Sequence, residues 1–367
     1  MALARRTIKF INSMLDWGWD FTKKKPITTY NPSRQDVKGE DVVPVYTLYH
    51  YNEKELTETT LPESEACNVK KHGDIVWMNI DGLKKEEVER ISRTYDLHAL
   101  VVEDILSTGQ RAKMDETGDV IYCLLPMIYY NEGTGQIEAE QVSIVLGKGF
   151  VLSFQEDQTR DVFNPVRDKL RTAGSKLRQS PADYLCYALI DVIVDSYFSV
   201  LEKMNERIEK LEDKILLQQE KAATEKISIL RREVMTLRRL IAPVRELVSG
   251  FLRSESHLLE YSQDKYYKDV YDHITQANEY ADAHRDLLIN LQDVFTSQLN
   301  MRMNEVMKIF TMVATLLAPA TVIGGIFGMN FDVIPLAHKN EGFWAAVAAM
   351  FLIPLVMLIW FKRKGWF

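Results

Sequence analysis

Cysteine is scarce in this chain of 367 residues, which contains only Cys67, Cys123 and Cys186. The three form neither a CxxC pair nor another paired spacing, so the sequence predicts neither a disulfide framework nor a zinc site built from thiolates. This cysteine usage suits the reducing environment of the cytosol.

Signals of enzymes and of nucleic-acid-binding proteins are also missing. No GxxxxGK[ST] loop occurs, so an ATP-driven pump is not expected, and no grouping of nucleophile, base and acid indicates an enzyme. The chain has 52 acidic and 45 basic residues and a net charge of −7. This balance counts against a nucleic acid partner and is compatible with cations. Lys9 and Asp16 break the apolar stretch after Arg6, so no secretory signal is predicted.

Long apolar runs, in contrast, are present near the C-terminus. Two uncharged runs of nineteen residues, Ile309–Phe327 and Phe343–Phe361, are joined by fifteen residues. Each run is long enough to cross a lipid bilayer as a helix. Two spans with so short a connection form a hairpin, which places the residues before and after it on the same side of the membrane.

Charge at the ends of the runs predicts which side this is. Basic residues lie next to the runs and away from the connection, at Lys308, Lys362, Arg363 and Lys364. The connection carries both signs, with His338 and Lys339 against Asp332 and Glu341. Because Lys and Arg favour the cytoplasmic side, we expect an inner-membrane protein with both termini in the cytoplasm.

The region before the runs predicts an α+β domain, with a mixed sheet and flanking helices. Strand patterns cover Val43–Tyr51, Asp74–Ile80, Asp119–Tyr130 and Gln141–Phe154. Helical patterns cover Lys84–Tyr95 and Leu100–Leu106. The sequence does not indicate the order of the strands.

Three long helices are predicted after this domain. Apolar residues recur every three or four positions from Leu185 to Ile215, a second helix covers Thr224–Arg253, and a third begins near Asp264 and continues into the first apolar run. About sixty residues of helix would form a rod of about 90 Å. We therefore divide the chain into an N-terminal extension (1–41), a cytoplasmic α/β domain (42–165), a helical bundle (166–262), a stalk helix continuous with the first span (263–327), an outer loop (328–342), a second span (343–361) and a basic cytoplasmic tail (362–367).

One side of the third helix is small or polar where its other sides suit lipid. Steps of three and four give Asp293, Ser297, Asn300, Asn304, Met307, Thr311, Ala314, Ala318, Thr321, Gly325 and Gly328, which we call the stripe. A stripe of this kind can be a face for helix packing. The aspartate at its start, its asparagines and the neighbouring Asn330 favour a water-filled path.

A single hairpin cannot enclose such a path, so several copies would have to surround one axis. Ring symmetry would turn Asp293 into a ring that concentrates cations at the inner mouth, and Asn330 into a ring of amide oxygens at the outer mouth. The second run suits an outer position facing lipid, with Trp344 and Trp360 as interfacial anchors.

Several motifs in the chain resemble those of the CorA family of magnesium transport proteins, in its prokaryotic form. They are Asn304-Glu-Val-Met-Lys, Pro319, the run Gly-Ile-Phe-Gly-Met-Asn-Phe ending at Phe331, and the tail Phe361-Lys-Arg-Lys-Gly-Trp-Phe. Further matches are Val102-Glu-Asp-Ile-Leu with Gln110-Arg111, Glu140-Gln-Val-Ser, Ala182-Asp-Tyr-Leu with Ile190-Asp191, and Asp269-Val-Tyr-Asp-His. The resemblance extends over nearly the whole chain from about Val42.

The resemblance implies a homopentamer with a funnel-shaped cytoplasmic domain and a pore lined by the first span. It implies magnesium influx that is passive and gated by cytoplasmic magnesium. The implied roles are a selectivity filter at Gly328, Met329 and Asn330, a hydrophobic constriction at Met307 and Phe310, and an inner pore along Asn304 and Asp293, with Thr321 on the lining side. Asp104 and Asp269 match carboxylates that bind regulatory magnesium between subunits, and Glu103 and Asp191 match an adjacent second site. Without the resemblance, all four would be read as surface carboxylates.

The chain also departs from the family pattern. Leu336 stands where relatives often have glutamate, Ala318 stands where some have methionine, and Phe327 replaces a frequent tyrosine. Hydrated magnesium suits rings of amide oxygens, and the stripe contains no cysteine or histidine of the kind that zinc or copper prefers. Two alternatives stay open: a transporter of zinc, cobalt or nickel with the same fold, or a membrane-tethered cytoplasmic sensor or scaffold.

Overall fold

The computed structural model describes residues 43–61, 74–107, 109–157, 160–217, 222–330, 334–336 and 340–366. The expected N-terminal extension lies outside the described residues, as do Asp332, His338 and Lys339 of the expected outer loop. The chain divides into two compact units, one made of the residues up to 210 with 228–286 and the other of 211–227 with 287–367.

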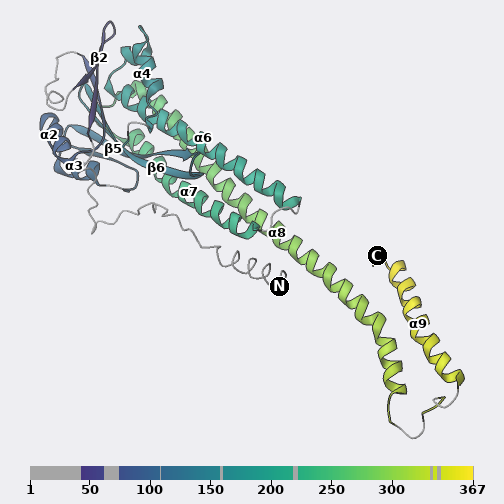
Figure 1. The fold of residues 1–367 in the computed structure, drawn as a ribbon. Helices are drawn as coiled ribbons and strands as arrows, with labels where there is room; N and C mark the ends of the chain where they lie inside the picture. The colour runs from purple at the N-terminus through teal and green to yellow at the C-terminus, as the bar shows by residue number, and fades with distance from the viewer. Residues whose placement is uncertain are drawn as a thin grey trace. The chain divides into compact units, whose positions relative to one another are not determined.

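The first unit contains a mixed sheet with the strand order β2-β1-β3-β7-β6-β5-β4 (Figure 1). The strands are β1 (Val45–Tyr51), β2 (Leu56–Leu61), β3 (Ile75–Asp81), β4 (Lys113–Thr117), β5 (Val120–Asn131), β6 (Gln136–Gly147) and β7 (Phe150–Gln155). The central strands β3 and β7 pair in parallel, and the other neighbouring strands pair antiparallel.

The structure corrects the strand expected at Gln141–Phe154, because this segment contains parts of two strands. Gly147 ends β6 and Phe150 begins β7. Gly149 between them has a φ of 77°, a left-handed conformation that glycine adopts without the steric cost of a side chain. A Cβ atom on Gly147 would lie 2.1 Å from the Phe150 ring. Glycine is therefore favoured by the backbone at position 149, and at position 147 it leaves room for the Phe150 ring.

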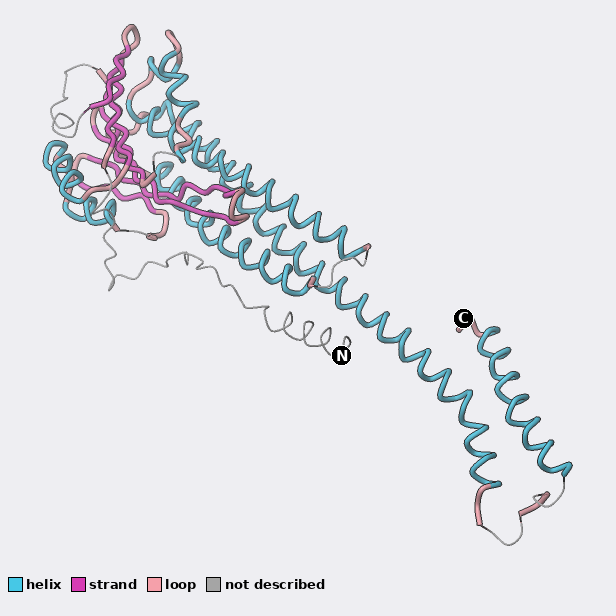
Figure 2. Tube along the Cα trace, viewed as in Figure 1, coloured by secondary structure: helices cyan, strands magenta, loops and turns pink. Residues whose placement is uncertain are grey.

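One face of the sheet is covered by helices α2 (Lys85–Tyr95) and α3 (Ala99–Leu106) (Figure 2). Val88 and Ile91 of α2, with Val101 and Ile105 of α3, are buried. They belong to one hydrophobic core with sheet residues that include Tyr46, Val76, Met78, Ile80, Tyr122, Leu124, Val145, Leu152 and Phe154. The position of α3 is thus fixed by apolar packing, while its polar residues remain at the surface.

On the other side of the sheet lie α4 (Asn164–Arg171) and parts of α6 (Ala182–Leu216), α7 (Ala223–Arg253) and α8 (Asp264–Phe327) (Figure 1). The short helix α5 (Lys176–Gln179) comes between α4 and α6 in the chain. The Tyr197 hydroxyl of α6 donates a hydrogen bond to the Pro126 carbonyl of β5 at 2.5 Å. Phe251 of α7 stacks on Tyr267 of α8 with the ring centroids 4.8 Å apart. Aromatic packing and hydrogen bonds therefore join the long helices to the sheet and to one another.

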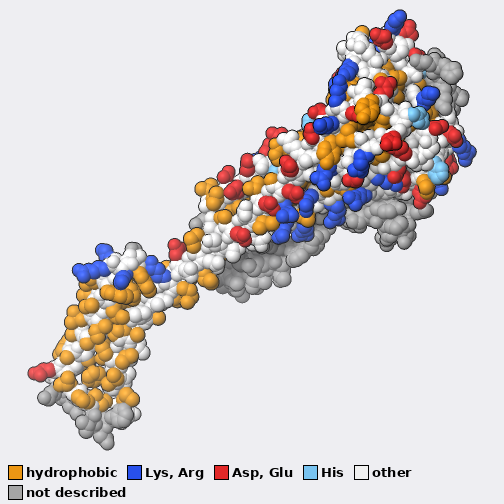
Figure 3. Space-filling view, turned by 180° about the vertical axis from the view of Figure 1, so that it is seen from behind, with side chains coloured by type: hydrophobic (Ala, Val, Ile, Leu, Met, Phe, Trp, Pro, Cys, Tyr) orange, Lys and Arg blue, Asp and Glu red, His pale blue; other side chains and the backbone are white. Residues whose placement is uncertain are grey.

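The second unit contains the distal part of α8 and helix α9 (Asn340–Arg363). By length and composition, α6, α8 and α9 are each long and apolar enough to cross a membrane. The most apolar 18 residues of α6 are 61% buried inside the protein, whereas the most apolar 18 residues of α8 and of α9 are 6% buried. Figure 3 shows hydrophobic side chains covering the surface of α8 and α9 in this unit.

The predicted fold class is confirmed in these elements. An α+β domain with a mixed sheet and flanking helices is followed by long helices, and two apolar helices end the chain.

Candidate functional site

The stripe on α8 is exposed along its length. Exposed side chains or glycines occupy positions 293, 297, 300, 304, 307, 311, 314, 318, 321, 325 and 328. A different side of the same helix is shielded: Met312 is buried, and Lys308, Thr315, Leu316, Pro319, Ala320 and Ile323 are half-buried. A Cβ atom on Gly324 would lie 3.7 Å from Met350 Cε of α9. The stripe therefore lies on a side of α8 that α9 leaves uncovered.

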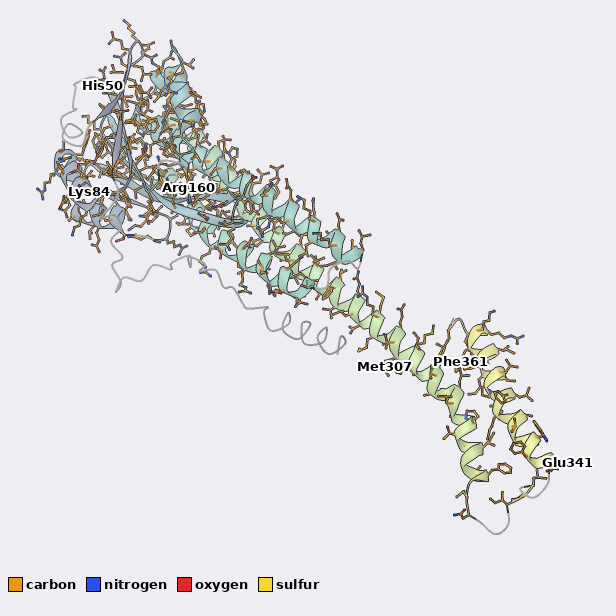
Figure 4. All side chains as sticks on the ribbon, in the orientation of Figure 1. His50, Lys84, Arg160, Met307, Glu341 and Phe361 are labelled. Atoms are coloured by element: carbon orange, nitrogen blue, oxygen red, sulfur yellow. The ribbon has the colours of Figure 1, made fainter. Side chains whose placement is uncertain are left out.

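Met307 and Phe310 are the bulky apolar residues assigned to the constriction. Their side chains are 57% and 67% exposed, respectively, so neither contributes to the core of its own chain. Figure 4 shows Met307 on α8. Exposed apolar groups of this size need lipid or another copy of the chain to cover them, or they narrow an aqueous path.

The two threonine hydroxyl groups on the stripe are hydrogen-bonded to their own helix. Thr311 Oγ1 donates to the Met307 carbonyl at 2.8 Å, and Thr321 Oγ1 donates to the Leu317 carbonyl at 3.1 Å. A hydroxyl that donates in this way keeps its oxygen lone pairs as acceptors. Thr311 and Thr321 can therefore present oxygen atoms to a hydrated cation.

The expected filter residues lie at the C-terminal end of α8. The backbone N–H of Gly328 donates to the Gly324 carbonyl at 2.9 Å, and that of Met329 donates to the Ile326 carbonyl at 3.3 Å. Asn330 follows and is exposed. A Cβ atom on Gly328 would lie 3.1 Å from the Gly324 carbonyl oxygen, so any larger residue would crowd the backbone. The C-terminus of a helix carries partial negative charge, which favours a cation beside Asn330.

The opposite end of the hairpin is basic. Lys308 Nζ of α8 donates to the Gly365 carbonyl at 3.4 Å and lies 5.9 Å from the centroid of the Trp366 ring. Trp366 stacks on Phe361 at 5.0 Å, and Phe361 lies at the opposite end of α9 from Glu341 (Figure 4). Lys and Arg side chains gather at this end in Figure 3. The tail is thus held against the start of the apolar part of α8.

Asp104 lies on α3 and is already engaged by neighbouring side chains. Gln110 Nε2 donates to Asp104 Oδ1 at 2.8 Å, and Lys113 Nζ lies 2.5 Å from Asp104 Oδ2. Gln141 Nε2 donates to the Asp104 carbonyl at 3.0 Å. Glu103 is exposed on the same helix.

Asp269 is exposed on α8, and the structure does not bring it together with Asp104 in one chain. Helix α3 packs on one face of the sheet, and α8 belongs to the layer on the other face. A cation in contact with both carboxylates would therefore have to lie between two chains.

Asp191 of α6 has neighbours that the sequence analysis missed. Asp191, Asp195 and His273 each place a potential ligand atom within 4.8 Å of the others, and His273 Nδ1 lies 3.2 Å from Asp195 Oδ1. Burial raises the pKa of Asp191 to about 6, and the charge of Asp195 adds to the rise. Asp195 is four residues beyond Asp191 on α6, a spacing that places both carboxylates on one helix face and could have indicated this pair. His273 lies on α8, so its place beside the pair is not indicated by spacing.

These donors are chemically suited to a divalent cation. Carboxylate oxygens suit magnesium, which keeps several waters and takes one or two carboxylates. The imidazole nitrogen of His273 also suits cobalt, nickel or zinc.

Comparison with known proteins identifies the family. Residues 72–363 match the family described as CorA-like Mg2+ transporter protein. The chain is 36% identical to the Cobalt/magnesium transport protein CorA of Thermotoga maritima over 324 aligned residues. The alignment covers 88% of this chain and 90% of that protein.

The chain belongs to the CorA family. A second relative, the Putative metal ion transporter YfjQ of Bacillus subtilis, is 31% identical over 297 residues, covering 80% of this chain and 91% of YfjQ. The structure of the CorA magnesium transporter from Methanocaldococcus jannaschii shares the fold, with a TM-score of 0.72 and 22% identity over 89% of this chain and 99% of that one. The resemblance found in the sequence is thus confirmed, and the CorA family is one of ion transporters rather than enzymes.

Proposed function

We propose that this CorA-family protein is a homopentameric channel through which magnesium passes down its electrochemical gradient into the cytoplasm. The observation that carries the proposal is the exposed stripe on α8, which runs from Asp293 to Gly328 on a side that α9 leaves uncovered. A membrane-tethered sensor would need no such stripe of small and polar residues.

In this proposal, residues 263–327 form the stalk and the lining helix, 328–342 the outer loop, 343–361 the outer span and 362–367 a basic cytoplasmic tail. Five copies of the stripe surround the axis. Lys308 and the basic residues at the end of α9 lie at the cytoplasmic side in this proposal, because Lys and Arg are enriched on the cytoplasmic side of membranes.

The filter in this proposal consists of Gly328, Met329 and Asn330. Magnesium loses its water reluctantly, so the Asn330 amide oxygens bind the hydrated ion through hydrogen bonds to its waters. The C-terminus of each α8 adds negative partial charge at the same place. Asn304 and Asp293 continue the path inward, and Met307 with Phe310 closes it by excluding water.

Cytoplasmic magnesium closes the channel in this proposal. Asp104 of one chain and Asp269 of a neighbour would hold the ion, with Glu103 and Asp191 beside it. The separation of Asp104 and Asp269 by the sheet within one chain supports a site between chains. A bound ion neutralises carboxylates that otherwise repel, and so it stabilises the closed arrangement.

The test is magnesium flux into proteoliposomes that contain Asn330→Ala, with Asn340→Ala at the start of α9 as the matched control. Asn330→Ala is expected to abolish selective uptake while the protein still elutes as a pentamer, and Asn340→Ala is expected to retain uptake. Wild-type flux in Asn330→Ala would remove the filter assignment, and elution as a monomer in wild type would remove the pentamer.

A second candidate is transport of cobalt, which the name of the Thermotoga maritima relative includes. The imidazole of His273 beside Asp191 and Asp195 is a ligand that suits cobalt better than magnesium. Offering magnesium, cobalt and zinc separately to the same vesicles distinguishes the candidates by their initial rates.

A further inference from the structure

Both carboxylate oxygens of Asp104 are occupied by donors from one short segment of the chain. Gln110 Nε2 donates to Oδ1 at 2.8 Å, and Lys113 Nζ lies 2.5 Å from Oδ2. The Asp104 side chain is 19% exposed and that of Lys113 is 35% exposed. This ion pair is therefore partly withdrawn from water, where screening is weaker than at an open surface.

Lys113 has a second acidic neighbour. Its Nζ lies 3.3 Å from Asp115 Oδ2, and the Asp115 side chain is 51% exposed. Burial lowers the pKa of Lys113, but the hydrogen bond and charge of Asp104, with those of Asp115, outweigh it and raise the pKa overall. Lys113 is thus a permanent positive charge that can pair with either carboxylate.

The backbone fixes this arrangement. Lys113 is the first residue of β4 and pairs in register with Leu124 of β5, while α3 is anchored by the buried Val101 and Ile105. Lys113 can therefore leave Asp104 only by moving its side chain, and Asp115 lies within its reach.

We propose that Lys113 is a tethered counter-ion that competes with a divalent cation for the Asp104 carboxylate and so sets the cytoplasmic magnesium concentration at which the channel closes. This inference rests on the proposed role of Asp104 as a sensor. An ammonium group and a divalent cation repel each other when both contact one carboxylate oxygen. Cation binding therefore moves Lys113 from Asp104 to Asp115, and the loss of the first ion pair weakens cation binding.

Removing the competing charge should increase the affinity for magnesium. A partly exposed ion pair contributes up to about 1 kcal/mol, which corresponds to a change of about fivefold in a binding constant. A residue that only positioned Asp104 would have the opposite effect, because its loss would disorder the carboxylate and weaken binding.

The experiment measures protection of the full-length protein from chymotrypsin during a titration with magnesium chloride, because chymotrypsin cleaves after aromatic residues and the lysine variants keep its cleavage sites. Lys113→Gln is expected to reach half-maximal protection at about one fifth of the wild-type magnesium concentration, and Lys113→Arg, which keeps the charge, should stay near wild type. The matched control is Lys85→Gln, because Lys85 forms an ion pair with Glu89 at 4.0 Å on the neighbouring helix α2. An unchanged midpoint in Lys113→Gln, or a shift to higher magnesium, would overturn the inference.

A second pair of variants separates this inference from the proposed sensor. Asp104→Asn should lose the protection, and adding Lys113→Gln to it should restore nothing. If Asp104→Asn keeps the wild-type curve, the sensor assignment fails together with the inference. If Asp104→Asn loses protection while Lys113→Gln leaves the midpoint unchanged, only the role of Lys113 is wrong. Lys113→Met gives a second uncharged side chain, and its midpoint must move in the same direction as that of Lys113→Gln.

Discussion

At the scale of single residues, the environment of Asp191 predicts an effect of pH on stability. Burial raises the pKa of this carboxyl to about 6 from 3.8, with Asp195 adding to the rise. Because the pKa of Asp191 is higher in the folded than in the unfolded protein, its protonated form stabilises the fold. This contribution to the free energy of unfolding is fully present below pH 3.8 and is lost as the pH rises through about 6. At neutral pH without a divalent cation, the ionised Asp191 therefore destabilises the fold.

Asp191→Asn is accordingly expected to raise the thermal unfolding midpoint at pH 8, in the presence of a chelator, relative to wild type. The gain should correspond to about 1 kcal/mol, because the partial exposure of the site reduces the full effect of the shift. The difference should shrink at pH 5, where wild-type Asp191 is mostly protonated. Asp213→Asn, at an exposed position of the same helix, is the control. An equal gain at both pH values would contradict the assignment of the effect to ionisation.

At the scale of helices and strands, regular periodicity determined what could be predicted from the sequence. The predicted helices at Lys84–Tyr95 and Thr224–Arg253 each begin within one residue of α2 and α7, because their apolar spacing is regular. Edge strands β2 and β4 were missed because their sequences, LTETTL and KMDET, are largely polar. Such strands are recognised by their pairing with a neighbour rather than by a buried face.

In the candidate site, too, relations within one helix could be predicted from the sequence, whereas relations between different elements could not. The stripe lies on one helix, so spacing alone indicated it. The grouping of Asp191 and Asp195 with His273 joins two helices, as does the separation of Asp104 from Asp269 by the sheet. The ion pair between Asp104 and Lys113 also depends on how α3 and β4 fold. None of these relations follows from local sequence.

The proposed pore-lining side of α8 gives a prediction about closure. Met307 and Phe310 are exposed apolar residues beside small or polar neighbours, and a ring of such groups excludes water from a narrow path. The double variant Met307→Ser with Phe310→Ser should therefore leak magnesium even when cytoplasmic magnesium is high. Val313→Ser, on another side of the same helix, should stay closed. If vesicles that contain the double variant admitted no more magnesium than wild-type vesicles, the gate would have to lie elsewhere.

The segment after α8 gives a prediction about ion capture. Leu336 is 55% exposed and has a φ of 68°, a conformation that is costly for a residue with a bulky side chain. Leu336→Glu should add negative charge near the proposed outer mouth and lower the magnesium concentration for half-maximal uptake. Leu336→Gln is the control, because glutamine has the shape of glutamate without its charge. This variant should leave the magnesium concentration for half-maximal uptake unchanged. Equal values for the two variants would contradict an electrostatic effect.

At the scale of the whole molecule, passive influx requires a means of closure. A divalent ion that crosses 100 mV gains about 4.6 kcal/mol, at about 2.3 kcal/mol per charge. This energy supports accumulation on the order of a thousandfold. An open pore would therefore overload the cell, so the proposed channel needs a sensor that responds to the ion it admits.

In the proposed channel, Asp104 and Asp269 form that sensor between chains. Asp269 lies on α8, which continues into the proposed pore lining, and Asp104 lies on α3 across the sheet. A cation that bridges Asp104 of one chain and Asp269 of its neighbour would hold the α8 helices in one arrangement. Without the cation, the carboxylates repel each other and the ring of subunits loosens.

The double variant Asp104→Asn with Asp269→Asn should therefore lose the protease protection that millimolar magnesium gives wild type, and should keep conducting when cytoplasmic magnesium is high. Asp286→Asn, at another exposed position of α8, should behave as wild type. If the double variant were still protected and still closed by magnesium, regulation would have to lie at Glu103 and Asp191 or within the pore.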